Sequence, residues 1–190
     1  MTDLSNALVP RSEWLLDPDI SFLNHGSYGA VPRSVLEEQR RLQERMERNP
    51  NEFLALELPH ALRTGANRLA TFIKGAGSSD LVFIENATAG CNTVLGSVRL
   101  SPGDEILVTD HGYPAIRKAA EHHAARTGAV VIEATVPFPI RDPIEIVNAV
   151  ASRLGPRSRL VILDHVSSPT AIVFPVANSQ RCVMKRARRF

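Results

Sequence analysis

The chain has 190 residues, of which 44% are hydrophobic and 22% are charged, close to the averages of soluble globular proteins. This length suits one domain or a large part of one, and the apolar content excludes wholesale disorder. No apolar run approaches the roughly 20 residues that span a bilayer, and the first residues do not resemble a secretory signal. We therefore expect a cytoplasmic protein without membrane contact.

The net charge of +2 conceals an uneven distribution. Residues 177–190 contain five Lys and Arg residues and no acidic residue, so the first 176 residues carry a net charge of −3. A body of that sign is not expected to bind nucleic acid, and only the tail could do so. Cys91 and Cys182 lie far apart and predict no disulfide framework, and Cys91 is expected to be a small core residue. The adjacent His122 and His123 cannot share one helix face, so no metal site is expected.

The first part of the chain predicts a loop and two helices. Asn24 to Gly29 is glycine-rich and reads as a loop. Pro32 suits a helix start, and Val35, Leu36, Leu42 and Met46 are spaced as in an amphipathic helix that stops at Asn49-Pro50. A second helix is expected from about Pro59 to Lys74, closed by Gly75-Ala76-Gly77.

After residue 76 the pattern alternates between short apolar runs and helical stretches. Such runs are typical of parallel strands covered by helices on both faces, which predicts an α/β fold with a mostly parallel sheet. The expected strands are Leu81–Ile84, Glu105–Thr109, Ala129–Ala134 and Arg159–Leu163. The expected helices are Thr88–Val98, Pro114–Arg126 and Asp142–Leu154. Residues 177–190 show no apolar periodicity, so three parts are expected: a helical segment over 1–75, a partial large domain over 76–176, and a basic tail.

Ligands of parallel α/β sheets bind beyond the carboxyl ends of the strands, so the segments that follow each strand are the candidate sites. Asn86, Ala87 and Thr88 open a helix after the first expected strand, which suits a phosphate, although this segment taken alone favours the alternative that Asn86 or Thr88 only caps the helix. His111 follows the second strand and offers a flat ring for stacking, with a structural histidine as the alternative. The fourth strand ends in a polar cluster, Asp164 to Thr170, which loop hydrogen bonding would also explain.

Together these segments resemble the class V aminotransferase superfamily of fold-type I pyridoxal-phosphate enzymes. The motifs that carry the resemblance lie in order between about Leu15 and Val176: Phe22-Leu23-Asn24-His25-Gly26-Ser27-Tyr28-Gly29, Asn86-Ala87-Thr88, Pro102-Gly103-Asp104-Glu105 with His111, and Asp164-His165-Val166-Ser167-Ser168-Pro169-Thr170. The first and last motifs point to the isopenicillin N epimerase-like branch. The resemblance implies a dimeric enzyme that acts on an amino acid.

The resemblance also implies roles for individual residues. Asn86, Ala87 and Thr88 would hold the phosphate of pyridoxal 5'-phosphate, and His111 would stack on its ring. Ser168 stands where many relatives have an asparagine that contacts the ring hydroxyl, and because serine is shorter, Thr170 could share that contact. Asn24 and His25 would lie near the substrate.

The resemblance stops after Val176, before the position of the lysine that would bind the cofactor covalently. The chain has three lysines, Lys74, Lys118 and Lys185, and none matches that position. Asp164 is a less favoured candidate for the acid that protonates the ring nitrogen, since that acid follows a later strand in this branch. We therefore expect a truncated enzyme without catalytic residues, which does not attach the cofactor covalently and exposes apolar surface. The alternative is a non-catalytic fragment that binds the cofactor weakly or pairs with a partner subunit.

Overall fold

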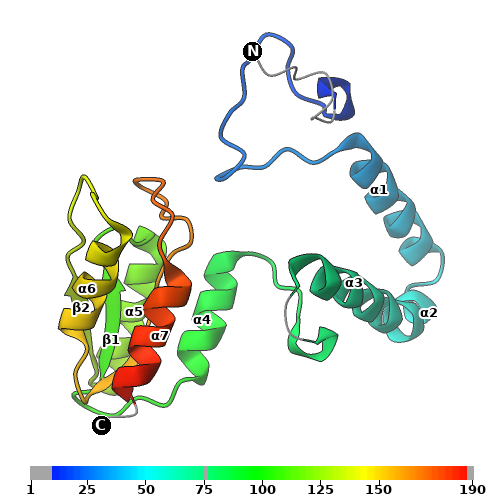
Figure 1. Ribbon diagram of the computed structural model, residues 1–190. Coiled ribbons are helices and arrows are strands. Elements are labelled where there is room, and N and C mark those ends of the chain that lie inside the picture. Colours follow the sequence, from blue (N-terminus) through cyan, green and yellow to red (C-terminus); the bar gives the residue numbers. More distant parts are fainter. Residues whose placement is uncertain (1–9, 75–76, 188–190) are drawn as a thin grey trace. The chain divides into compact units, whose positions relative to one another are not determined.

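A computed structural model describes residues 10–74 and 77–187, and the chain divides into two compact units, Met1–Phe83 and Ile84–Phe190. The first unit is helical (Figure 1). Its elements are η2 (Arg11–Glu13), α1 (Arg33–Arg48), α2 (Pro50–Glu52), the π-helix η3 (Phe53–Glu57), α3 (Leu58–Ile73) and η4 (Ser78–Asp80). The prediction of two helices is confirmed.

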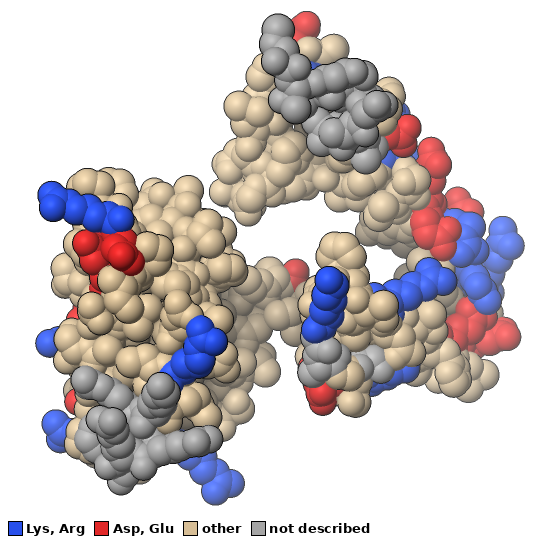
Figure 2. All heavy atoms as spheres, in the orientation of Figure 1, with Lys and Arg blue, Asp and Glu red and all other residues tan. Residues whose placement is uncertain are grey.

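Proline and asparagine set the boundaries of α1. Pro32 precedes its first residue, and the helix ends at Arg48, next to Asn49-Pro50. The Asn49 side chain then caps the next turn by accepting the N–H of Glu52 at 3.2 Å, so the chain continues through α2 and η3 into α3. No residue of α1 is buried, and Figure 2 shows acidic and basic side chains lying beside one another over this helix. The predicted closing turn after Lys74 falls partly on residues 75–76, which lie outside the described residues.

The second unit is a three-layer α/β structure around a parallel sheet in the order β2-β1-β3 (Figure 1). Its strands are β1 (Glu105–Thr109), β2 (Val130–Ala134) and β3 (Ser158–Val161). Its helices are α4 (Ala87–Ser97), α5 (Pro114–Thr127), α6 (Pro143–Arg153) and α7 (Val176–Ala187). The α/β prediction with a parallel sheet is confirmed.

The central strand β1 explains why the helices take opposite faces. Ile106 and Val108 pack with Leu95 of α4 and with Ala120 and Ala124 of α5 on one face. The alternate residue, Leu107, is on the other face and packs with residues of α6 and α7, because side chains alternate along a strand. The sheet therefore lies between α4 and α5 on one side and α6 and α7 on the other.

Two predictions about the chain after residue 76 are wrong. Leu81–Ile84 is not a strand, and the side chains of Val82, Phe83 and Ile84 are at least half exposed. An apolar run becomes a strand only when it pairs with another strand, and this run pairs with neither edge of the three-stranded sheet. Residues 177–187, expected to be patternless, form most of α7, in which Ser179 is fully buried and Val183 packs against the core under β1. The basic side chains of this helix from Lys185 onward lie outside the described residues.

Candidate functional site

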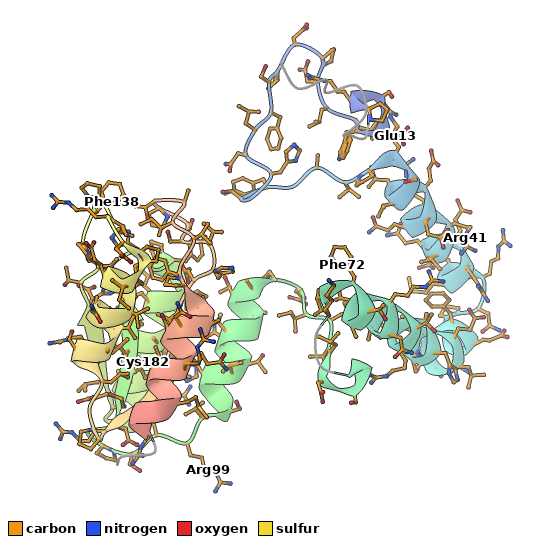
Figure 3. The ribbon with its side chains drawn as sticks, in the orientation of Figure 1. Glu13, Arg41, Phe72, Arg99, Phe138 and Cys182 are labelled. Atoms are coloured by element: carbon orange, nitrogen blue, oxygen red, sulfur yellow. The ribbon has the colours of Figure 1, made fainter. Side chains whose placement is uncertain are left out.

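The carboxyl ends of β1 and β3 meet where the chain changes sides of the sheet. The loop after β1 leads to α5 on one face, whereas the segment after β3 leads to α7 on the other. Such a switch point is where open parallel sheets bind ligands. In Figure 3, Phe138, in the loop after β2, marks this end of the unit, and Arg99, before β1, marks the opposite end.

The amino end of α4 reaches the same edge. The helix packs against β1 and runs back to the start of that strand, so its first residues lie at the strand's carboxyl end. Asn86 is its N-cap, and the Asn86 side chain accepts the N–H of Ala89 at 2.9 Å. The capping alternative therefore holds for Asn86. The N–H groups of Ala87 and Thr88, at the first two positions of the helix, have no partner among the described residues, which leaves them available to an anion.

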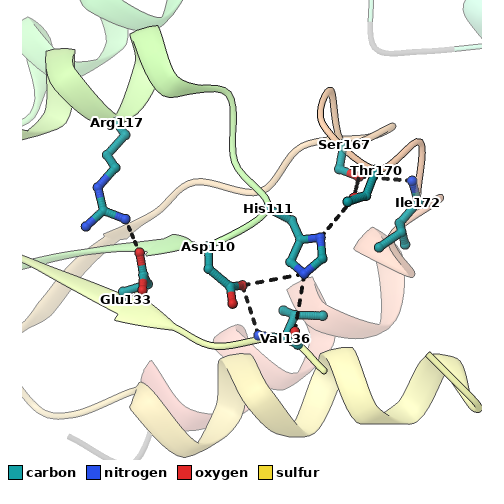
Figure 4. A network of polar contacts seen from close by, with 8 residues as sticks. All are labelled: Asp110, His111, Arg117, Glu133, Val136, Ser167, Thr170 and Ile172. Carbon is teal, nitrogen blue, oxygen red and sulfur yellow. Dashed lines mark hydrogen bonds and ion pairs between the residues drawn. The ribbon is translucent and has the colours of Figure 1, made fainter. Parts of the chain in front are cut away.

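His111 lies at the centre of a polar network (Figure 4). Its Nδ1 is 2.8 Å from Oγ1 of Thr170, and its Nε2 is 3.2 Å from the carbonyl oxygen of Val136. The ring is only 8% exposed, and the ring of Phe138 lies 6.0 Å from it at an angle of 46°. Hydrogen bonds thus fix His111 at the wall of the site. The alternative that His111 is a structural histidine therefore explains part of its surroundings.

The loop after β3 supplies the rest of this network. Ser167 is buried, lies 2.9 Å from the hydroxyl of Thr170, and accepts the N–H of Ile172 at 2.9 Å. The structure therefore brings Thr170 together with His111, as both were predicted to be in the site. Ser168 is exposed and takes no part in these bonds.

Asp164 has a structural partner. It accepts the N–H of Tyr113 at 2.9 Å, directly before α5 begins at Pro114. Burial raises the pKa of the Asp164 carboxyl, and the hydrogen bond from Tyr113 opposes that rise. The hydroxyl of Thr109 is buried nearby without a partner among the described residues. The Asp164 carboxyl therefore lies at the switch point, where burial disfavours its ionised form.

Sequence reasoning missed two residues of the network, Asp110 and Ser167. Asp110 accepts the N–H of Val136 at 2.9 Å and lies 3.9 Å from Nε2 of His111. Its position directly after β1 could have indicated it, because that is where ligand-binding side chains gather. Nothing local distinguishes Ser167 from Ser168.

The remaining predicted residues lie in the first unit, which is described by itself. Asn24 and His25 are both exposed. The carbonyl oxygen of Asn24 accepts the N–H groups of Ser27 and Tyr28, and Nδ1 of His25 accepts the N–H of Ala30 at 3.3 Å. Their role near a substrate stays a prediction.

An apolar groove of about 420 Å³ separates α4 from the free edge of β3. Its lining consists of Ile84, Ala87, Gly90, Cys91, Val94 and Leu95 on one side and Leu160, Val161, Ile162 and Leu163 on the other. Cys91 and Cys182 are free cysteines. Over the described ranges, no three metal-binding side chains come together, and none of the helices has the length and apolar character needed to cross a membrane.

Comparison with known proteins matches residues 24–187 to the sequence model of the family Aminotransferase class-V. The match continues through α7. The isopenicillin N epimerase of Amycolatopsis lactamdurans is 38% identical over 168 residues, which are 87% of this chain and 42% of that protein. An L-cysteine desulfhydrase of Arabidopsis thaliana is 27% identical over 83% of this chain and 37% of its own length.

A solved structure of C-DES with glycine covalently linked to the pyridoxal-phosphate cofactor is also similar. It has a TM-score of 0.78 and 26% identity, over 96% of this chain and 46% of that one. The chain thus spans less than half the length of the relatives it matches.

Proposed function

Because the chain belongs to the aminotransferase class-V family, which is pyridoxal-phosphate dependent, we propose that it forms the cofactor-holding part of an enzyme of the isopenicillin N epimerase-like type. The observation that carries the proposal is a pair of amides, those of Ala87 and Thr88, which have no partner in the described part of the chain and lie at the sheet edge that also bears His111. An amino-acid substrate, a homodimeric assembly and a contact of Asn24 and His25 with the substrate belong to the same proposal.

The residues present fit the phosphate of the cofactor. Two free N–H groups and the positive end of the α4 dipole suit a dianion, and the partly buried Thr88 hydroxyl adds a third donor. His111 would lie against the ring, while Ser168 and Thr170 would lie near the ring hydroxyl. When bound, the cofactor supplies an electron sink for bonds broken at the substrate's α-carbon. These residues would bind and orient it, and they move no proton themselves.

The lysine and the acid that the chemistry also requires are proposed to lie outside these 190 residues. Lys74 ends α3 in the first unit, and Lys118 is exposed on α5. Lys185 belongs to α7, but its side chain lies outside the described residues. We therefore expect this chain alone to bind the cofactor reversibly and to catalyse no turnover.

Equilibrium dialysis with pyridoxal phosphate and with pyridoxal tests this proposal. Pyridoxal lacks the phosphate and is expected to bind at least tenfold more weakly, which corresponds to about 1.4 kcal/mol. Reduction of the mixture with borohydride, followed by peptide mapping, is expected to give only scattered, substoichiometric labelling of lysines. Equal affinity for the two compounds would refute the phosphate site. A single stoichiometric adduct at Lys74 or Lys118 would refute the expectation that this chain binds the cofactor without a covalent bond.

A further inference from the structure

The imidazole of His111 is held at both nitrogens, and the two contacts differ in kind. Nε2 lies 3.2 Å from the carbonyl oxygen of Val136, with a carboxylate oxygen of Asp110 at 3.9 Å. Both oxygens can only accept a hydrogen bond. Nε2 must therefore carry a proton.

The same reasoning fixes the other nitrogen. A neutral imidazole has one N–H, so Nδ1 is an acceptor, and the Thr170 hydroxyl at 2.8 Å donates to it. Thr170 has then used its only proton, so the Ser167 hydroxyl at 2.9 Å donates to Thr170. Ser167 itself accepts the N–H of Ile172 at 2.9 Å. Every bond from Ile172 to Val136 thus runs in one direction (Figure 4).

Reversing this chain has a cost at Ser167. Reversal of every bond would have Nδ1 donate to Thr170 and Thr170 donate to Ser167, and it would leave an unprotonated Nε2 facing the carbonyl oxygen of Val136, with two acceptors opposed. The Ser167 hydroxyl proton would then have no acceptor among the described residues, and this side chain is only 2% exposed. An unsatisfied buried donor and two opposed acceptors are both unfavourable, so in the neutral ring the network selects the tautomer with the proton on Nε2.

We propose that Thr170 is a positioning residue that fixes both the tautomer and the plane of His111, an inference that rests on the proposed stacking of His111 on the cofactor ring. The two groups that hold the ring, the carbonyl of Val136 and the hydroxyl of Thr170, come from different loops, one after β2 and one after β3. Together they prevent rotation of the imidazole. A neutral ring can lie against a pyridine ring that carries a proton without the repulsion that a second cation would add. Because the Thr170 proton is committed to His111, Thr170 cannot donate it to a ligand.

Long-range ¹H–¹⁵N correlation spectra of the full chain labelled with ¹⁵N-histidine report this tautomer directly. At a pH where imidazole is neutral, His111 is expected to show a protonated Nε2 and an unprotonated Nδ1. Thr170→Val, which keeps the shape but removes the donor, is expected to give mixed tautomers. Thr170→Ser should restore the single tautomer, and Ser168→Ala should leave the spectrum unchanged, since Ser168 lies outside the chain of bonds. Circular dichroism would establish that each variant folds.

Affinity for pyridoxal phosphate provides the second readout. Thr170→Val is expected to weaken binding about fivefold, the worth of one hydrogen bond, with Thr170→Ser close to wild type. A mixed or Nδ1-protonated wild-type ring, or an unchanged tautomer in Thr170→Val, would overturn the inference even if the cofactor binds. A wild-type chain that shows the expected tautomer but has no affinity for the cofactor would instead refute the proposed function and, with it, the stacking role of His111.

Discussion

Replacing Thr88 with alanine tests the phosphate site at the amino end of α4. Thr88 is the second residue of the helix, is partly buried, and would give a phosphate both its N–H and its hydroxyl. The substitution removes the hydroxyl together with the γ-methyl group, and it keeps the N–H. One hydrogen bond contributes about 1 kcal/mol, so the dissociation constant of inorganic phosphate or pyridoxal phosphate should rise roughly fivefold. Alanine is the better helix former, so the helix itself should not be weakened.

Thr93→Ala is the matched control, because it makes the same change five residues farther along α4, near the middle of the helix. The Thr93 hydroxyl donates to the carbonyl oxygen of Ala89 at 2.9 Å, away from the amino end. Binding is measured by titration calorimetry, and the amides of residues 86–90 are expected to exchange more slowly with phosphate present. Unchanged affinity in Thr88→Ala would show that the Thr88 hydroxyl does not contact the anion. An equal loss in Thr93→Ala would show that the effect is not specific to the start of the helix.

Two further predictions concern stability and association. Burial raises the pKa of Asp164 above its unfolded value, so the folded state binds more protons, and the free energy of unfolding should fall as the pH rises upward from about 4. Asp164→Asn keeps an acceptor for the N–H of Tyr113, but its free energy of unfolding, measured with urea over a pH series, should not show this decline. An equal decline in the two proteins would contradict the prediction. The isolated chain is expected to self-associate or to be partly molten, and Val94→Lys, in the groove beside β3, should weaken association. Val94 is 52% exposed, so its burial between two chains would contribute about half of the 1.5–3 kcal/mol of a fully buried valine. Losing that contribution would raise the dissociation constant of the associated chains roughly tenfold at most. Ile144→Lys on α6, at 51% exposure, is the control, and light scattering that finds a wild-type monomer with a cooperative melt would refute this expectation.

The elements with strong local signals follow directly from the amino-acid sequence. Asn86 caps α4, Pro114 begins α5, and Asp142 caps α6 by accepting the N–H of Ile144 at 2.8 Å. Gly128 ends α5 with a φ of 73°, which favours glycine. Helix boundaries depend on residues a few positions apart, so the sequence alone determines them. The placement of His111 after β1 and of Thr170 after β3 also follows, because parallel strands end at a common edge.

Only the tertiary structure decides which apolar runs become strands and which hydroxyls meet. Leu81–Ile84 has the composition of a strand but pairs with neither edge of the sheet, whereas the basic segment after Val176 becomes helical as its apolar side packs under β1. The bond between Thr170 and His111 joins residues 59 positions apart, and the bond from Tyr113 to Asp164 spans 51. Strand pairing and such bonds form between distant parts of the chain. Their geometry is set by how the sheet and its loops pack, and no local pattern encodes it.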